Sequence, residues 1–121
     1  MSYTTLNGIS TFRINNYDEA VAFYCNFLGF HLDWEHRMAP DEPVSMQVSK
    51  NGLALHLSDN PRFQTGSVVF VETRGLDELR KEIEANKGQF ELAEIEDTPW
   101  GTRQLEITDP SGNLLRFNQN A

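Results

Sequence analysis

The polar side chains that could carry chemistry lie on segments whose apolar residues alternate with polar ones. Gln104 and Glu106 alternate with apolar neighbours between 103 and 108, and Arg116 does so between 114 and 118. This two-residue period is typical of a strand with one buried and one polar face. A carboxylate and a guanidinium on facing surfaces can pair with each other or bind the charged groups of a ligand. We expect Glu106 and Arg116 to pair if the two polar faces meet, and such a pair is more often structural than catalytic.

The three histidines are predicted to act apart from one another. His56 alternates with Leu55 and Leu57 and should therefore lie on the polar face of its strand, as a hydrogen-bonded group or, alternatively, as a metal ligand. His31 and His36 stand an odd number of residues apart on one predicted strand, which places them on opposite faces. No nucleophilic side chain stands beside a base in a pattern that indicates covalent catalysis.

Aromatic side chains near these strands could stack on a planar ligand. Trp100 follows a proline at the head of a predicted strand, where it either packs over the strand edge or offers a stacking platform. Trp34 and Phe63 are further candidates for the same role. Phe70 shares a predicted strand face with Val68, so it is expected in a cavity wall.

The scaffold that must position these residues is predicted to be a β-rich structure built twice. Strands are expected over 8–14, 30–37, 44–49 and 53–58, and again over 67–73, 89–96, 103–108 and 114–118. A helix is expected after the first strand of each half, over 19–28 and 76–86. The pair Asp18-Glu19 recurs as Asp77-Glu78 after 59 residues, and the turn glycine Gly52 recurs as Gly112 after 60. The prediction is an α+β fold in one domain, 1–121, made of two βαβββ modules over about 6–58 and 67–119, joined by a linker over 59–66.

Charge and composition narrow the partners that we expect. The 121 residues include 10 Lys and Arg against 18 Asp and Glu, a formal net charge of −8. This charge disfavours nucleic acid and anionic membranes and favours cations, or serves solubility alone. The single cysteine, Cys25, forms no internal disulfide and is expected to be a buried, inert thiol. No apolar run is long enough for a membrane span, and no signal sequence is seen, so a cytoplasmic location is expected.

Four segments together resemble the vicinal oxygen chelate superfamily, which contains glyoxalases, bleomycin resistance proteins and dioxygenases. They are 18–30 with its LGF exit, 53–58, 74–79 with RGLDEL, and 99–117 with PWG and DPSGN. The last two together are closest to the bleomycin resistance branch. The resemblance implies two βαβββ modules whose mixed sheets curl around a cup-shaped cavity, usually closed by dimerisation.

The resemblance also implies where a metal would be bound in the enzymes of the superfamily. Their four ligand positions correspond to Ile9, His56, Val68 and Arg116 in this chain. Only His56 can ligate a metal there, because two of the others are apolar and the guanidinium is a permanent cation. A catalytic metal needs about three protein ligands, so this set favours a protein without a cofactor.

The resemblance, together with these residues, implies a homodimeric, metal-free binding protein that sequesters a cationic antibiotic such as bleomycin in a cleft between protomers. The residues expected to bind this ligand are His56, Phe70, Trp100, Gln104, Glu106, Arg116, Trp34 and Phe63. No nucleic acid or membrane partner is expected. One alternative is a metal-dependent glyoxalase-like lyase or ring-cleaving dioxygenase with an unusual ligand set around His56. Another is a structural dimer whose cup is filled by side chains.

Overall fold

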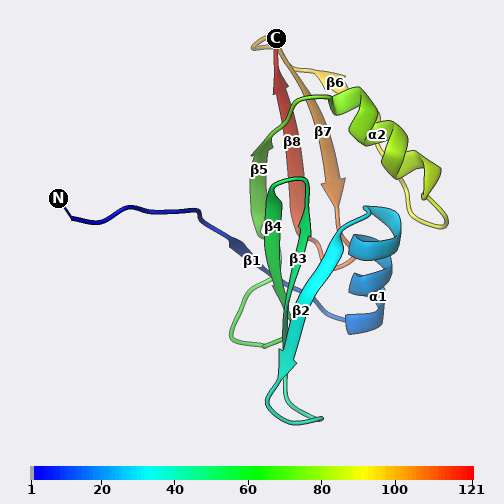
Figure 1. Ribbon diagram of the computed structural model, residues 1–121. Coiled ribbons are helices and arrows are strands. Elements are labelled where there is room, and N and C mark those ends of the chain that lie inside the picture. Colours follow the sequence, from blue (N-terminus) through cyan, green and yellow to red (C-terminus); the bar gives the residue numbers. More distant parts are fainter. Residues whose placement is uncertain (1) are drawn as a thin grey trace.

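The computed structural model describes residues 2–121 and contains two four-stranded mixed sheets with helices on one side (Figure 1). In the first sheet the strand order is β1 (Ser10–Arg13), β4 (Leu53–Ser58), β3 (Val44–Lys50) and β2 (His31–Arg37). The second sheet has the order β5 (Val68–Glu72), β8 (Leu114–Asn120), β7 (Thr102–Thr108) and β6 (Glu96–Asp97). The parallel pairs are β1 with β4 in the first sheet and β5 with β8 in the second. All other neighbouring strands pair antiparallel. The predicted α+β fold is confirmed, and neither sheet closes into a barrel.

The first helical segment changes type along its length. α1 (Tyr17–Val21) starts after Asn16, whose Oδ1 accepts a hydrogen bond of 2.8 Å from the Glu19 backbone N–H. It continues as the π-helix η1 (Ala22–Phe27), in which the chain winds more widely than in the single helix expected over 19–28. The aromatic side chains of η1 are buried. Cys25 on the same segment is half-buried, and burial raises the pKa of its thiol, so it stays protonated.

The second helix, α2 (Leu76–Ala85), begins at a glycine and not at a side-chain cap. Gly75 adopts φ +73°, which a residue with a Cβ rarely takes. The Leu76 backbone N–H instead donates to Oε1 of Gln119 on β8, at 2.8 Å. This bond ties the amino end of the helix to the sheet beneath it.

One apolar core joins the helices to the inner faces of both sheets. It includes Leu105 and Ile107 of β7 and Leu115 and Phe117 of β8, all 5% exposed or less. These strands therefore turn their apolar residues inward, as their alternation predicts. No helix in the described part of the chain is long and apolar enough to cross a membrane.

The prediction of a strand over 89–96 is wrong except at its last residue. β6 covers only Glu96–Asp97, and the preceding residues form an irregular segment. Three of its side chains, Phe90, Leu92 and Ile95, nevertheless pack against the core, which explains why the segment has the apolar pattern of a strand.

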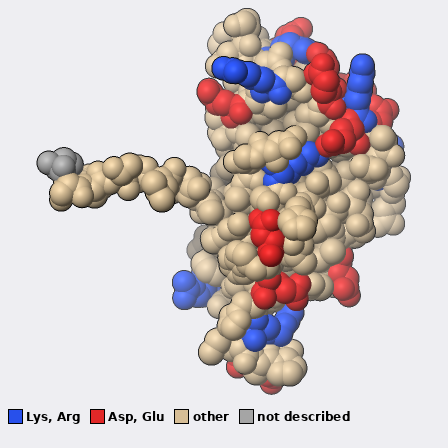
Figure 2. Space-filling model, in the orientation of Figure 1, with Lys and Arg blue, Asp and Glu red and all other residues tan. Residues whose placement is uncertain are grey.

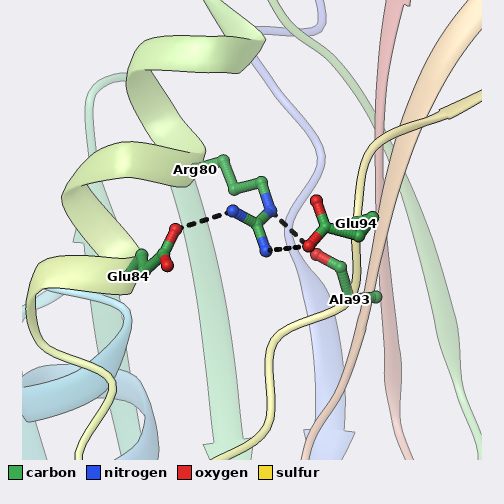
Figure 3. A network of polar contacts seen from close by, with 4 residues as sticks. All are labelled: Arg80, Glu84, Ala93 and Glu94. Carbon is green, nitrogen blue, oxygen red and sulfur yellow. Dashed lines mark hydrogen bonds and ion pairs between the residues drawn. The ribbon is translucent and has the colours of Figure 1, made fainter.

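A guanidinium makes one of the backbone hydrogen bonds that a neighbouring strand would have made there (Figure 3). Nε of Arg80, on α2, donates to the Ala93 carbonyl oxygen at 2.9 Å, and its two terminal nitrogens contact Glu84 and Glu94. Because a side chain satisfies this backbone carbonyl, the segment does not need a neighbouring strand at that point.

The turn between β7 and β8 holds a buried carboxylate. Asp109 is 4% exposed and accepts four hydrogen bonds: from the Tyr24 hydroxyl at 2.6 Å, from the backbone N–H groups of Ser111 and Asn113, and from Asn113 Nδ2. Burial is the main cause that raises the pKa of Tyr24, so its hydroxyl remains a donor. Asn113 Nδ2 also donates to the Arg13 carbonyl oxygen at 2.8 Å. The turn thus binds both the first helix and β1.

Replacing this carboxylate by an amide is expected to destabilise the fold strongly. In Asp109→Asn, an amide nitrogen, which is itself a donor, would replace one accepting carboxylate oxygen among the same donors. This should lower the free energy of unfolding by about 3 kcal/mol. Urea denaturation followed by circular dichroism measures the change. The exposed loop substitution Asp41→Asn serves as control and should change stability by less than about 0.5 kcal/mol. Equal midpoints for the two variants would contradict the role of Asp109.

Candidate functional site

The polar face of the first sheet carries a hydrogen-bonded chain that ends at His56. The strand register aligns Trp34, Gln47, His56 and Thr11 across four strands. His56 Nε2 lies 2.9 Å from Gln47 Oε1, and Gln47 Nε2 donates to Asp33 Oδ2 at 3.0 Å. Because an amide oxygen only accepts, the imidazole must carry its proton on Nε2, which leaves Nδ1 as an acceptor in the neutral ring.

The edge strand of this face contains a β-bulge at Asp33. The pairing register shifts between Leu32 and Trp34, so one residue is unpaired. His31 is therefore opposite Ser49 and His36 opposite Ser45 of the same partner strand. The two partners are an even number of residues apart, so both histidines lie on one face. The expectation of opposite faces was wrong because the bulge adds a residue that the alternation does not reveal.

The polar face of the second sheet carries a charged pair at the equivalent place. Arg116 on β8 is opposite both Phe70 on β5 and Glu106 on β7. Its Nε donates to Glu106 Oε2 at 2.8 Å, as expected from the sequence. The two side chains are 38% and 47% exposed, so the pair lies at the surface and is not buried. Beside it, Gln104 Nε2 donates to Asn118 Oδ1 at 3.1 Å.

A small acidic hollow opens next to this pair. It has a volume of about 190 Å³ and is lined by Trp100, Gln104, four carboxylates and neighbouring residues of 93–99. The carboxylates are those of Glu94, Glu96, Asp97 and Glu106, and neither Lys nor Arg lines it. Trp100 is 69% exposed at its edge. Negative charge beside an exposed indole is an arrangement that suits an organic cation.

The eight residues expected to bind ligand fall into separate groups. Trp100, Gln104 and Glu106 lie in the acidic hollow, with Arg116 and Phe70 beside it across the strands. Trp34 and His56 meet on the other sheet, with ring centroids 5.3 Å apart and edge to face. Phe63 stands apart in the linker, where its carbonyl accepts from Arg13 Nη1 at 3.1 Å.

Sequence reasoning missed several members of these groups. Gln47 alternates with buried Met46 and Val48, as His56 does with its neighbours, so the same pattern would have found it. Glu94, Glu96 and Asp97 form an acidic run before Trp100, and that run was the available signal. These residues lie beside Gln104 and Glu106 of β7 only because of how the backbone folds between them, and alternation along the sequence does not show this.

The residues present do not fit the metal site of the superfamily's enzymes. Within residues 2–121, no group of three or more His, Cys, Asp or Glu side chains could hold a metal ion. At the position where those enzymes carry a carboxylate, the Arg116 guanidinium is bonded to Glu106. His56 is hydrogen-bonded to the Gln47 amide, and its row of Trp34, Gln47, His56 and Thr11 holds no further His, Cys, Asp or Glu.

Two βαβββ halves, each presenting a polar pair on its outer face, define a glyoxalase-type α+β protein. A family described as "Glyoxalase superfamily protein" matches residues 4–121. The chain therefore belongs to the glyoxalase superfamily.

Known proteins with this fold have different activities. The bleomycin resistance protein of Geobacillus stearothermophilus is 25% identical over 128 residues, which cover 94% of this chain and 96% of that protein. The crystal structure of a bleomycin-binding protein complexed with bleomycin superposes with a TM-score of 0.75 at 20% identity, covering 97% of this chain and 100% of that one. A glyoxalase-related enzyme from Clostridium phytofermentans gives a TM-score of 0.72 at 22% identity, with coverages of 99% and 98%. The fold alone therefore does not choose between binding and catalysis.

The hydrogen-bonded chain on the first sheet can be tested through the pKa of Asp33. Hydrogen bonds from Gln47 first, and then from Ser49, hold the pKa of this carboxyl below its usual range. A carboxyl with a depressed pKa contributes stability above its unfolded pKa of about 3.9, and this contribution is lost as pH falls through the folded value. In Gln47→Leu the pKa of Asp33 should rise towards its usual value, as measured by ¹³C NMR titration of the carboxyl carbon.

The matched control is Ser45→Ala, because Ser45 is exposed on the same strand and face. It should leave the Asp33 titration unchanged. If Gln47→Leu also left it unchanged, the chain from Asp33 to His56 would not exist in solution.

Proposed function

We propose that this protein binds and sequesters a cationic antibiotic of the bleomycin type and breaks no bond in it. The observation that carries the proposal is the acidic hollow beside the exposed Trp100. The bleomycin resistance relative that matches nearly the whole chain supports the same ligand class.

The negative charges of the hollow favour the cationic end of such a ligand. Glu106 is paired with Arg116, and Glu94 contacts Arg80. Glu96 forms no ion pair within residues 2–121 and therefore supplies the negative charge free to meet a cation, whereas Asp97 stands opposite the Arg103 cation on β7. A cation held over the Trp100 face gains about 0.5–2 kcal/mol, and the net charge of −8 attracts it over longer range.

We propose further that the complete site is a cleft between two copies of the chain in a cytoplasmic homodimer. The hollow of about 190 Å³ is smaller than the roughly 300–1,000 Å³ that drug-sized ligands occupy. Further apolar surface that a ligand could contact lies on the outer faces of the sheets, where Trp34, Val68 and Phe70 are 44–54% exposed. Val68 and Phe70 share one face of β5, and contiguous exposed apolar side chains commonly mark an interface. A second copy would bring its His56 and Trp34 group towards the hollow of the first.

The division of the chain is part of this proposal. We propose that residues 6–58 and 67–119 are two modules of one domain joined by the linker 59–66, and that each contributes one wall of the cleft.

Isothermal titration with bleomycin tests the proposed ligand. The unmodified protein should bind with a dissociation constant in the micromolar range or below, and added salt should weaken binding because the attraction is partly ionic. Trp100→Ala should weaken binding by about 5–30-fold, whereas Trp100→Phe, which keeps an aromatic face, should retain most of it. Glu96→Gln should weaken it and Glu42→Gln, in an exposed loop, should not. Absence of binding at about 100 µM bleomycin would remove the antibiotic proposal.

Light scattering coupled to size-exclusion chromatography tests the dimer. The unmodified protein should elute as a dimer at micromolar concentration. Phe70→Lys places a charge on the proposed interface and should shift the equilibrium towards monomer, because burying an unpaired ammonium is costly. Glu91→Lys, on the irregular segment before β6, is the charge control and should remain dimeric. Two variants that both stay dimeric would place the interface elsewhere.

A further inference from the structure

A second and larger cavity lies on another part of the molecule, between the turn of the β3–β4 hairpin and the amino-terminal half of α2. We call it the hairpin groove. Its volume is about 580 Å³, which is within the range of small-molecule sites. None of its lining residues lines the acidic hollow. Both halves of the chain build its walls, since Leu53 comes from β4 and Leu79 from α2.

The floor of the groove is apolar. The aromatic rings of Phe30 and Phe117 lie there with Leu28 and Ile83, all 5% exposed or less. Leu53 and Leu79 are half-buried and remain open to a ligand. Apolar atoms of a ligand placed on such a floor are removed from water, which favours binding.

One charged pair is already part of the wall. The Lys50 side chain is 11% exposed, pairs with Glu82 of α2 and also donates to the Leu28 carbonyl oxygen at the end of the first helical segment. Gly29 leaves room for this ammonium, because a Cβ on residue 29 would stand 3.1 Å from Nζ. The Lys50 charge is therefore neutralised within the protein and is not offered to an anion.

The charges left at the rim are predominantly negative. Glu72, Arg74 and Glu78 line the groove and make no side-chain hydrogen bond or ion pair within residues 2–121. Glu78 Oε2 lies at the amino end of α2, 3.3 Å from where a Cβ on Gly75 would stand. Figure 2 shows acidic and basic side chains gathered around α2, with uncharged atoms between them.

We propose that the hairpin groove is a second binding site, for a small amphipathic cation with an aliphatic or aromatic body and one ammonium group. The body lies on the Phe30, Leu53 and Leu79 floor, and the ammonium meets Glu72 and Glu78 at the rim. A carboxylate in the same place would face two unpaired carboxylates with one guanidinium to offset them. The ligand contacts both halves of the chain and so stabilises their packing.

Three six-carbon probes of different charge test this assignment: hexyltrimethylammonium, hexanol and hexanoate. Each is titrated into ¹⁵N-labelled protein and followed by NMR. The cation should cause saturable shifts at the amides of Leu53, Gly75 and Leu79, with weaker binding for the alcohol and the weakest for the carboxylate. It should also raise the melting temperature. Equal or tighter binding of hexanoate, or no saturation by the cation, would overturn the proposal.

Variants separate the groove from the acidic hollow. Glu78→Gln should weaken binding of the cation to the groove several-fold, whereas Glu91→Gln, outside the groove, should not. Trp100→Ala should leave the groove affinity unchanged, and Glu78→Gln should leave bleomycin binding unchanged. Shifts that occur only at the Trp100 indole would assign the cation to the hollow and contradict the second site. Failure of bleomycin to bind would leave the groove result standing, so the two proposals fail separately.

Discussion

The buried carboxylate of Asp109 is the constraint that orders the rest of this structure. A carboxylate removed from water must be surrounded by donors, and its four donors come from its own turn and from Tyr24 in the first half of the chain. Packing of the first helical segment against the β7–β8 turn supplies the fourth of these donors. Asn113 extends the same connection, with its amide nitrogen bound to β1 and its oxygen accepting from Ser67 before β5. The position of β8, and with it that of Arg116, follows from these bonds.

The alternation of side chains along each strand then determines which residues lie on the outer faces of the sheets. Once Leu115 and Phe117 are buried, Arg116 must point outward, and antiparallel pairing places it opposite Glu106. The same rule in the first half places His56 opposite Gln47. His56 and Arg116 are 60 residues apart, and Gln47 and Glu106 are 59 apart, so the two pairs occupy equivalent places in the repeat. One architecture thus carries a histidine–amide pair on one sheet and a carboxylate–guanidinium pair on the other.

Local patterns predicted the parts of the fold that depend on local chemistry. β4 was predicted to the residue, because two turn signals bound an alternating segment. The irregular segment before β6 was not predicted, since its backbone is held by Arg80 from a distant helix. The bulge at Asp33 was also missed, because alternation alone does not show an extra residue. For the site, alternation identified Gln104, Glu106 and Arg116, but only the folded chain shows which of them share a hollow with Glu96 and Asp97.

Arg116 connects the metal-ligand position implied by the superfamily resemblance to the proposed binding function. Its guanidinium stands where the enzymes of the superfamily place a carboxylate, and it neutralises Glu106 at the inner side of the hollow. Within residues 2–121, the charge in the hollow that has no cation beside it is that of Glu96, on β6 at the outer strand of the sheet. Under the proposed function, the cationic end of a ligand must therefore lie towards β6. The same cationic end then meets the Trp100 face, and the remainder of the ligand extends over Phe70 on β5, at the opposite edge of the sheet, where a second copy of the chain would cover it.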